Sequence, residues 1–354
     1  MKILTIVGAR PQFIKASVVS AAIQQKGMSE VIVHTGQHFD SNMSDIFFGQ
    51  LGIPEPQYNL NISGGSHGAM TGAMLTEIER VMLMEKPDQV LVYGDTNSTL
   101  AGALAASKLH ISLAHVEAGL RSYNMKMPEE INRILTDQLS NILLCPTSQA
   151  IENLRSEGFD NKNVQIHQVG DVMQDSALFY AERSTKPESV SIEERFILAT
   201  IHRAENTDDP DRLKSIIDAL NQLHTFIPVI MPLHPRTEAA IKALDLVLNV
   251  EVIPPQGYLE MLWLLDHCGI VVTDSGGVQK EAFFFNKPCV TARDQTEWVE
   301  LIDTDANVLV GADGNKLINE VKARYSQRVN DANELYGGGK ASQRIAQLLL
   351  ESNV

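Results

Sequence analysis

The stretch Gly269-Ile270-Val271-Val272-Thr273-Asp274-Ser275-Gly276-Gly277-Val278-Gln279-Lys280-Glu281 carries the clearest structural signal in the chain. A short apolar strand passes through a polar turn with two glycines into a helix. The free N–H groups of Ser275, Gly276 and Gly277 at the start of such a helix point towards an anion, and phosphate is the natural occupant. Glu281, one turn later, can accept hydrogen bonds from two neighbouring ribose hydroxyls. The alternative interpretation is a structural turn whose glutamate favours the helix dipole.

Length and composition indicate a folded protein of two domains. The chain has 354 residues, about twice the length of a typical domain. Hydrophobic residues make up 44% and charged residues 21%, which is typical of soluble globular proteins. No apolar run is long enough to span a membrane, and the opening segment 1–8 is too short for the core of a signal peptide. We therefore expect a cytoplasmic protein.

Charge and cysteine usage exclude several classes of partner. The net charge of −15 argues against nucleic acid and anionic membrane surfaces, which require an extended basic face. Cys145, Cys268 and Cys289 stand in apolar contexts at wide spacings, and we interpret them as buried free thiols in a reducing compartment. No metal-binding spacing such as His-Glu-x-x-His occurs, so no metal is expected.

The order of predicted elements indicates an α/β fold in which a parallel sheet with covering helices occurs twice. The first five predicted strands are Ile3–Val7, Val31–Thr35, Gln89–Val92, Ser112–Val116 and Ile142–Cys145. The second five are Phe196–Thr200, Pro228–Met231, Val250–Ile253, Gly269–Val272 and Cys289–Thr291. Predicted helices of the first half are Ile14–Gln25, Met70–Glu85 and Ser98–Leu109. The hinge is expected near residues 168–176, which gives domains at 1–170 and 171–336.

The clearest predicted helix begins at Pro128. Proline suits the first helical position, and Glu129 and Glu130 favour the positive end of the helix dipole. Apolar residues recur at helical spacing and keep one face of this helix hydrophobic. They are Ile131, Ile134, Leu135, Leu139 and Ile142.

Polar motifs follow several strands. Gly8-Ala9-Arg10-Pro11-Gln12-Phe13-Ile14-Lys15 places the two cations Arg10 and Lys15 beside a tight turn, which suits phosphate. Since Gly-x-Gly-x-x-Gly is missing, a dinucleotide is disfavoured. The alternative is a pair of solvated cations at a helix start.

Three carboxylates follow the next strands of the first half. Asp95 and Glu117 come at the ends of neighbouring strands, and Glu129 opens the helix after them. Convergence would raise their proton affinity and suit general acid and base chemistry. Alternatively, Asp95 caps the following helix and Glu117 meets an arginine such as Arg121 or Arg133.

Two histidine motifs follow strands of the second half. His202-Arg203 and His234-Pro235-Arg236 can each present an imidazole and a guanidinium to a diphosphate. A lone loop histidine is more often structural, but two such motifs share a sheet edge with the turn at Ser275. Because ligands bind beyond the carboxyl ends of parallel strands, the cleft between the two domains is the expected site.

Taken together, these motifs resemble the non-hydrolysing UDP-N-acetylglucosamine 2-epimerases over nearly the whole chain. The matching segments are Gly8–Pro11 with Lys15, Gln37-His38, Gly94–Thr96, His115–Arg121, Pro128–Arg133, His202-Arg203, His234, Asp274–Gly277 with Glu281, and Tyr336–Gly339. The resemblance implies two Rossmann-like domains of the glycosyltransferase-B type, a final helix at 337–354 that returns to the first domain, and a homodimer.

The resemblance also implies an activity that needs no cofactor. The C2 proton leaves as UDP departs from C1, and UDP then adds back to the 2-acetamido glycal with inversion at C2. By motif, the catalytic candidates are Asp95, Glu117, Glu129 and His202. The nucleotide would be held by Arg10, Lys15, His234, Gln256, Ser275, Gly276, Gly277 and Glu281.

Departures from the family pattern bear on the substrate. Trp298 replaces an arginine, Met261 replaces a residue that is often aromatic near the uracil, and Gln12-Phe13 replaces Glu-Ala. These features look like the branch that epimerises UDP-2,3-diacetamido-2,3-dideoxyglucuronate to the manno form, for surface polysaccharide precursors. The alternatives are plain UDP-N-acetylglucosamine as substrate, a UDP-sugar-dependent glycosyltransferase, or a nucleotide-sugar sensor without turnover.

Overall fold

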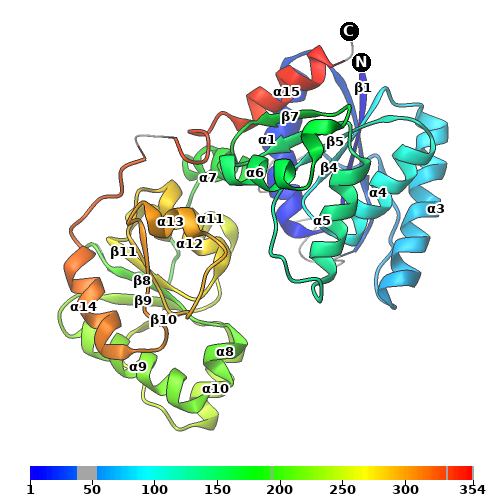
Figure 1. The fold of residues 1–354 in the computed structure, drawn as a ribbon. Helices are drawn as coiled ribbons and strands as arrows, with labels where there is room; N and C mark the ends of the chain where they lie inside the picture. Colours follow the sequence, from blue (N-terminus) through cyan, green and yellow to red (C-terminus); the bar gives the residue numbers. More distant parts are fainter. Residues whose placement is uncertain (38–53, 193, 332–333, 353–354) are drawn as a thin grey trace. The chain divides into compact units, whose positions relative to one another are not determined.

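A computed structural model describes residues 1–37, 54–192, 194–331 and 334–352. The described chain forms two compact units (Figure 1). Unit 1 comprises Met1–Ser176 and Glu334–Val354, and unit 2 comprises Ala177–Asn333. Each unit has a parallel sheet with helices, so the predicted α/β class is confirmed. Of the motif Gln37-His38, His38 lies outside the described residues.

Unit 1 contains, among its described residues, a seven-stranded sheet in the order β3-β2-β1-β4-β5-β6-β7. Its strands are β1 (Lys2–Val7), β2 (Ser29–His34), β3 (Tyr58–Asn59), β4 (Gln89–Tyr93), β5 (Ser112–Val116), β6 (Ile142–Cys145) and β7 (Gln165–Gln168). Its helices are α1 (Arg10–Gln25), α3 (His67–Glu85), α4 (Asn97–Lys108), α5 (Pro128–Leu139), α6 (Ser148–Ser156), the short η1 (Phe159–Asn161) and α15 (Ala341–Glu351). Helices α3, α4 and α5 pack in that order (Figure 1). Helix α7 (Val172–Ala181) spans the boundary between the units.

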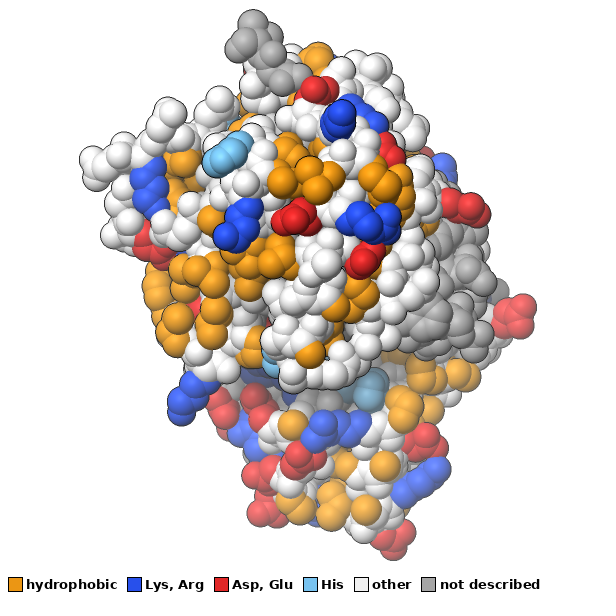
Figure 2. Space-filling view, turned by 90° about the vertical axis from the view of Figure 1, so that its right-hand side faces the viewer, with side chains coloured by type: hydrophobic (Ala, Val, Ile, Leu, Met, Phe, Trp, Pro, Cys, Tyr) orange, Lys and Arg blue, Asp and Glu red, His pale blue; other side chains and the backbone are white. Residues whose placement is uncertain are grey.

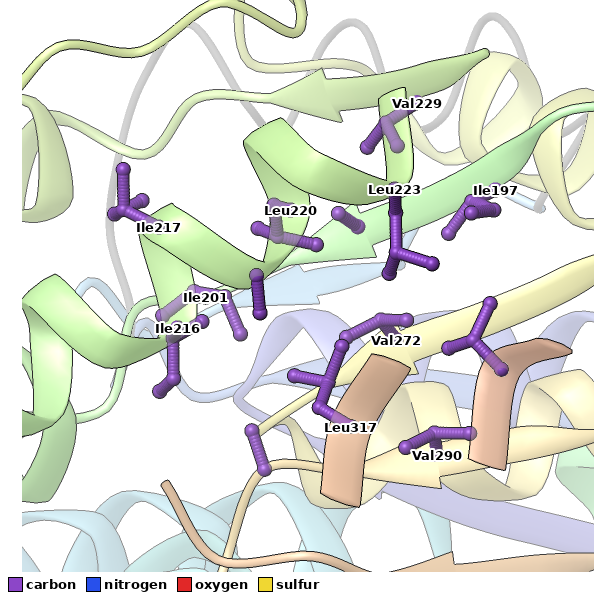
Figure 3. Close-up of a cluster of buried hydrophobic side chains, with 14 of the residues drawn as sticks. Ile197, Ile201, Ile216, Ile217, Leu220, Leu223, Val229, Val272, Val290 and Leu317 are labelled. Carbon is purple, nitrogen blue, oxygen red and sulfur yellow. The ribbon is translucent and has the colours of Figure 1, made fainter. Parts of the chain in front are cut away.

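The part of unit 2 that the structure describes forms a six-stranded sheet in the order β10-β9-β8-β11-β12-β13. Its strands are β8 (Ile197–Thr200), β9 (Val229–Pro232), β10 (Glu251–Ile253), β11 (Ile270–Thr273), β12 (Cys289–Thr291) and β13 (Asn307–Leu309). Its other helices are α8 (Ala204–Thr207), α9 (Pro210–His224), α10 (Pro235–Ala243), α11 (Tyr258–His267), α12 (Gly276–Phe284), α13 (Val299–Asp303) and α14 (Gly314–Arg324). Figure 3 shows buried side chains of α9, of α14 and of the strands meeting in the core of this unit.

All ten predicted strands are present, with ends within two residues of the prediction. Three short strands at sheet edges, β3, β7 and β13, were not predicted. Strand β7 reads Gln-Ile-His-Gln, and β3 has only two residues, so neither shows an apolar run. Helix α1 begins at Arg10 rather than Ile14, because Pro11 suits the first turn of a helix.

Helix α5 buries a different face from the one its apolar pattern suggests. Amphipathic helices usually pack their apolar stripe inwards. In α5 the apolar side chains of Ile131 and Leu135 are 40% and 44% exposed. The buried residues of this helix are polar: Glu130, Asn132, Thr136 and Asp137.

The last helix, α15, belongs to unit 1. Its residues Ile345 and Leu349 are buried, and the helix packs against α1. The Asp175 carboxylate accepts hydrogen bonds from the backbone N–H groups of Ala341 and Ser342, at 3.0 and 2.7 Å. This carboxylate therefore fixes the N-terminus of α15.

Two further expectations concern burial and hydrophobic length. All three cysteines are buried and free, as predicted. No helix within the described ranges combines the length and apolarity needed to span a bilayer.

Candidate active site

The predicted strand, glycine turn and helix are present at the end of β11, and the turn Ser275–Gly277 is hereafter called the cradle. Ser275 is the N-cap of α12, and the side chain of the preceding Asp274 is fully buried. The Asp274 carboxylate accepts hydrogen bonds from the backbone N–H groups of His202 and Arg203, at 2.9 to 3.1 Å. It also accepts from the Asn206 amide at 3.0 Å. Asp274 thus joins the loop after β8 to the cradle after β11.

The two glycines of the cradle differ in their surroundings. A Cβ added to Gly276 would lie 2.5 Å from Oε1 of Glu297, so a larger residue there would displace this carboxylate. A Cβ added to Gly277 would meet nothing within 4 Å, and Gly277 is exposed. Open space beside a helix N-terminus is what an anionic ligand requires.

A cavity of about 180 Å³ lies beside the cradle in unit 2. It brings together three residues that the sequence analysis named separately: His202, His234 and Gln256. The two imidazole rings are 5.4 Å apart between centroids. Met261, identified from the sequence as a departure near the base, also lines this cavity.

His202 has a lowered pKa. Burial is the largest cause, and the nearby His234 and Arg203 lower the pKa further. The Asp274 carboxylate opposes them but does not outweigh them. His202 is therefore neutral near pH 7 in the free protein, and its ring can donate or accept a proton.

The loop that carries Trp298 packs on the first turn of α12. The Trp298 indole N–H donates to the carbonyl of Gly276 at 2.9 Å. The Lys280 ammonium lies 4.2 Å from the centre of the indole ring. The Glu297 carboxylate accepts from Arg293 at 2.7 Å and lies 3.7 Å from Arg203. Trp298 therefore supports the cradle itself.

In unit 1 the carboxylate of Glu117 is nearly buried and paired. It is 8% exposed and forms an ion pair with Lys15. The backbone of Glu117 has a φ of 69°, a left-handed value that is rare for residues other than glycine. Such strained residues cluster at functional sites.

Asp95 is held by helix α5. Its carboxylate accepts from Nε of Arg133 at 3.1 Å, and its backbone carbonyl accepts from the Asn132 amide at 2.9 Å. The cap of α4 is Thr96, so Asp95 does not cap that helix. Arg133 had been considered as a partner of Glu117, but its observed partners are Asp95 and Glu130.

The remaining candidates are more exposed. Glu129 opens α5 and Arg10 opens α1, and both are exposed. Glu281 is half-buried in α12. The polar candidates divide between the units: Arg10, Lys15, Asp95, Glu117 and Glu129 belong to unit 1, and His202, His234, Gln256, Ser275–Gly277 and Glu281 belong to unit 2.

Sequence reasoning did not assign positioning roles to several buried polar residues. Asp274 was read as part of a turn, although its place between strand and helix was a usable signal. Gln12 accepts from the backbone N–H groups of Gly8 and Ala9, at 2.8 and 3.0 Å, and so shapes the turn after β1. No sequence pattern marks Asp137, which is fully buried in α5.

These features define an α/β enzyme of two Rossmann-like units, with a glycine turn at a helix N-terminus in one unit and paired carboxylates in the other. The family model for UDP-N-acetylglucosamine 2-epimerase matches residues 21–350. The chain belongs to this family, and it is an isomerase that acts as a UDP-sugar 2-epimerase.

Three relatives cover the length of the chain. A UDP-2,3-diacetamido-2,3-dideoxy-D-glucuronate 2-epimerase of Pseudomonas aeruginosa is 66% identical over 99% of both chains. The crystal structure of the Methanocaldococcus jannaschii UDP-GlcNAc 2-epimerase, in complex with UDP-GlcNAc and UDP, is 43% identical with a TM-score of 0.82, over 99% of this chain and 100% of that one. The Neisseria meningitidis enzyme bound to UDP-GlcNAc is 32% identical with a TM-score of 0.83, at the same coverage. These neighbours confirm the predicted glycosyltransferase-B type of fold.

Proposed function

We propose that this enzyme converts UDP-2,3-diacetamido-2,3-dideoxyglucuronate to its 2-epimer, the mannuronate form, as a step towards a surface polysaccharide. The observation that carries the proposal is the 66% identity to the Pseudomonas aeruginosa epimerase across 99% of the chain. Plain UDP-N-acetylglucosamine is the second candidate, because relatives at 43% identity are named for it.

The proposed reaction is an elimination followed by an addition. A base removes the C2 proton, the C–H electron pair forms a C1=C2 double bond, and the C1–O bond breaks with its electrons on UDP. UDP then attacks C1 while C2 receives a proton on the opposite face. Proton transfer by a positioned group and stabilisation of the leaving diphosphate are the two demands on the protein.

Unit 1 supplies the groups that move protons in this proposal. Glu117 and Asp95 are each held by a cation, Lys15 and Arg133, which fixes the two carboxylates. Glu129 is exposed at the start of α5, where a substrate can reach it. We assign the acid and base roles to these three carboxylates as a set.

Unit 2 supplies the nucleotide site in this proposal. The cradle residues Ser275, Gly276 and Gly277 hold the diphosphate, with the N–H groups of Gly276 and Gly277 donating to it, and Glu281 binds the ribose. The Ser275 N–H itself donates to Oγ1 of Thr273 at 2.9 Å. His202 and His234 line the adjacent cavity and support the leaving diphosphate. Gln256 lines the same cavity and contacts the nucleotide.

Proton NMR of the purified enzyme with single UDP-sugars in D2O tests the reaction and the substrate. We expect inversion and deuterium uptake at C2 without any acceptor, with a higher kcat/KM for the diacetamido glucuronate than for UDP-N-acetylglucosamine. A polar group left without a partner costs about 1–3 kcal/mol, so the preference should be roughly ten- to a hundredfold. Equal or faster turnover of UDP-N-acetylglucosamine would overturn the substrate assignment, and no inversion of any sugar would overturn the reaction.

We also propose a homodimer that uses the exposed apolar side of α5. The support is a group of exposed hydrophobic residues on α5 and on the loop before it, hereafter the α5 patch: Tyr123, Met125, Met127, Ile131 and Leu135. Figure 2, which faces the side of unit 1 that carries α3 and α5, displays hydrophobic side chains among charged ones. A second copy of the chain would remove this apolar surface from water.

Sedimentation velocity tests the dimer. Leu135→Arg should shift the protein from dimer to monomer without loss of folded structure, because the arginine would be buried without a partner. Val247→Arg, at a residue of unit 2 that is 68% exposed, is the matched control and should stay dimeric. A wild type that sediments as a monomer would contradict the proposal.

The free buried thiols suit a reducing cytoplasm, where we place the enzyme.

A further inference from the structure

His115, in the middle of unit 1, lies between two hydrogen-bond acceptors. It belongs to β5, and both its side chain and that of Asp137 in α5 are fully buried. Its Nδ1 lies 2.7 Å from Oδ1 of Asp137, and its Nε2 lies 2.7 Å from the carbonyl oxygen of Gly94. Neither acceptor belongs to the set of groups assigned above to the reaction.

Counting hydrogens fixes the form of this imidazole. A carbonyl oxygen carries no hydrogen, so Nε2 must donate to Gly94. The other oxygen of Asp137 accepts from the Gly119 backbone at 3.2 Å and from Arg121 at 2.7 Å. Hydrogen-bond donors beside both oxygens of Asp137 favour the ionised form of this carboxylate. Nδ1 must therefore donate as well, and the ring carries a hydrogen on each nitrogen.

The charges around His115 balance, which allows an imidazolium to stay buried. Arg121 is 1% exposed and donates to both oxygens of Glu157, at 2.6 and 2.8 Å. His115, Asp137, Arg121 and Glu157 thus alternate in sign and sum to zero. Burial acts to lower the pKa of Arg121, but the Glu157 and Asp137 carboxylates outweigh it and raise this pKa. Paired and hydrogen-bonded charges are the kind that interiors tolerate.

The imidazole fixes the turn that precedes Asp95. The Gly94 N–H donates to the carbonyl of Val116 at 3.0 Å, and the Gly94 carbonyl accepts from His115. The N–H and the carbonyl of Gly94 are therefore both hydrogen-bonded to residues of β5. Gly94 has a φ of 61°, so the turn has a left-handed backbone that is held by these two bonds.

The same turn lies against Glu117. A Cβ added to Gly94 would lie 3.2 Å from Oε2 of Glu117. Glu117 follows His115 by two residues and has its own left-handed backbone. A shift of the Gly94 carbonyl would therefore change the spacing between the Asp95 and Glu117 carboxylates.

We propose that His115 is a positioning residue: a doubly protonated, buried imidazolium, held by Asp137, that sets the distance between the carboxylates of Asp95 and Glu117. The catalytic half of this inference rests on the proposed function, because it assumes that both carboxylates transfer protons. The protonation half rests only on the hydrogen bonds. Effective catalysis requires such carboxylates to be placed within a fraction of an ångström.

Nitrogen-15 NMR of histidine-labelled wild type at neutral pH tests the protonation. Among the ten histidines, we expect one whose two ring nitrogens both carry a hydrogen that exchanges slowly with solvent. The signal should vanish in His115→Gln, and in Asp137→Asn it should become that of a neutral ring. A wild-type spectrum without such a ring would overturn the inference, whether or not either variant folds.

Kinetics test the positioning. His115→Gln keeps an amide donor for Gly94 but loses the charge, and it should lower kcat about ten- to a hundredfold. UDP binding is assigned to unit 2, so its stoichiometry and affinity should stay unchanged. A loss of folded protein would instead lower the number of UDP sites per chain. His167→Gln in β7 is the matched control and should keep wild-type kcat. An unchanged kcat in His115→Gln, with an active wild type, would overturn the positioning role, whereas an inactive wild type would point to the proposed function instead.

Discussion

Helix α5 of unit 1 and helix α9 of unit 2 bury opposite kinds of side chain. Helix α9 buries Leu213, Ile216, Ile217, Ala219, Leu220 and Leu223 in the core of its unit (Figure 3). Helix α5 buries Glu130, Asn132, Thr136 and Asp137 and exposes Ile131 and Leu135. Both sequences show a regular apolar stripe. The difference teaches that periodicity predicts a helix, whereas the neighbours of the helix decide which face is buried.

The buried polar face of α5 reaches the candidate catalytic groups. Asn132 and Arg133 hold Asp95, and Asp137 holds His115. The buried face of α9 lies in the hydrophobic cluster of unit 2. Substitutions connected with α5 should therefore change turnover, and substitutions in α9 should change stability.

The largest expected effect is on turnover. Asp95→Asn, Glu117→Gln and Glu129→Gln should each lower kcat by about 10²–10⁴-fold, because each removes a group assigned to proton transfer. UDP affinity, measured by calorimetry, should stay largely unchanged, because the nucleotide site is assigned to unit 2. Wild-type rates in all three variants would contradict the proposal that these carboxylates, two of which are held by or lie in α5, take part in the reaction.

The next effect is on stability. Leu220→Ala in α9 should lower the free energy of unfolding by about 2–5 kcal/mol, since it leaves a cavity in a fully buried core. Leu135→Ala in α5 should cost less than about 1 kcal/mol, because Leu135 is 44% exposed. Urea unfolding at low protein concentration measures both without a contribution from association. Equal costs would show that α5 packs like α9.

A smaller effect concerns the pH dependence of UDP binding in unit 2. The lowered pKa of His202 means that the free protein holds this ring neutral near pH 7. A bound diphosphate adds negative charge and raises that pKa, so binding takes up a proton. UDP affinity should then rise as the pH falls, by about tenfold for each unit by which the pKa rises. His202→Gln, compared with wild type at each pH, should lack this increment, and parallel curves would contradict the role of His202.

The smallest expected effect is the contribution of Glu130 in α5. Burial acts to raise its pKa, but hydrogen bonds from Ser122 and Tyr123 and the charge of Arg133 outweigh burial, and the pKa is lowered. A lowered carboxyl pKa contributes stability above the unfolded pKa of about 4.3, and this stability is lost as the pH falls through the folded value. Glu130→Gln should cost about 1 kcal/mol near pH 7. The deficit should shrink below about pH 4, and a deficit that stays constant with pH would contradict this account.

Much of the fold was predictable because its signals are local. Most of the ten predicted strands are short apolar runs bounded by turn residues, and these runs are buried in both sheets. The edge strands β3, β7 and β13 were missed, since an edge strand is defined by its neighbour and not by its own composition. The nucleotide cradle was predictable for the same local reason: strand, glycine turn and helix are contiguous from Gly269 to Glu281.

The candidate site was predictable only in part. The residues that contact a ligand in our proposal stand in short motifs, and His202, His234 and Gln256 do share one cavity. The residues that hold the candidate carboxylates in place could not be predicted. Asp95 pairs with Arg133 and Glu117 pairs with Lys15, 38 and 102 positions apart in the chain. No spacing rule connects such positions.

The sequence by itself determined the two parallel sheets, the strand-end positions of the candidate residues and the family, because apolar periodicity, glycine turns and contiguous motifs are properties of neighbouring residues. Only the tertiary structure decided which face of α5 is buried, which cation holds each carboxylate, and that Asp137 and Gly94 enclose His115. The physical reason is that a buried polar group must find its partner in space, and the partner can come from any part of the chain.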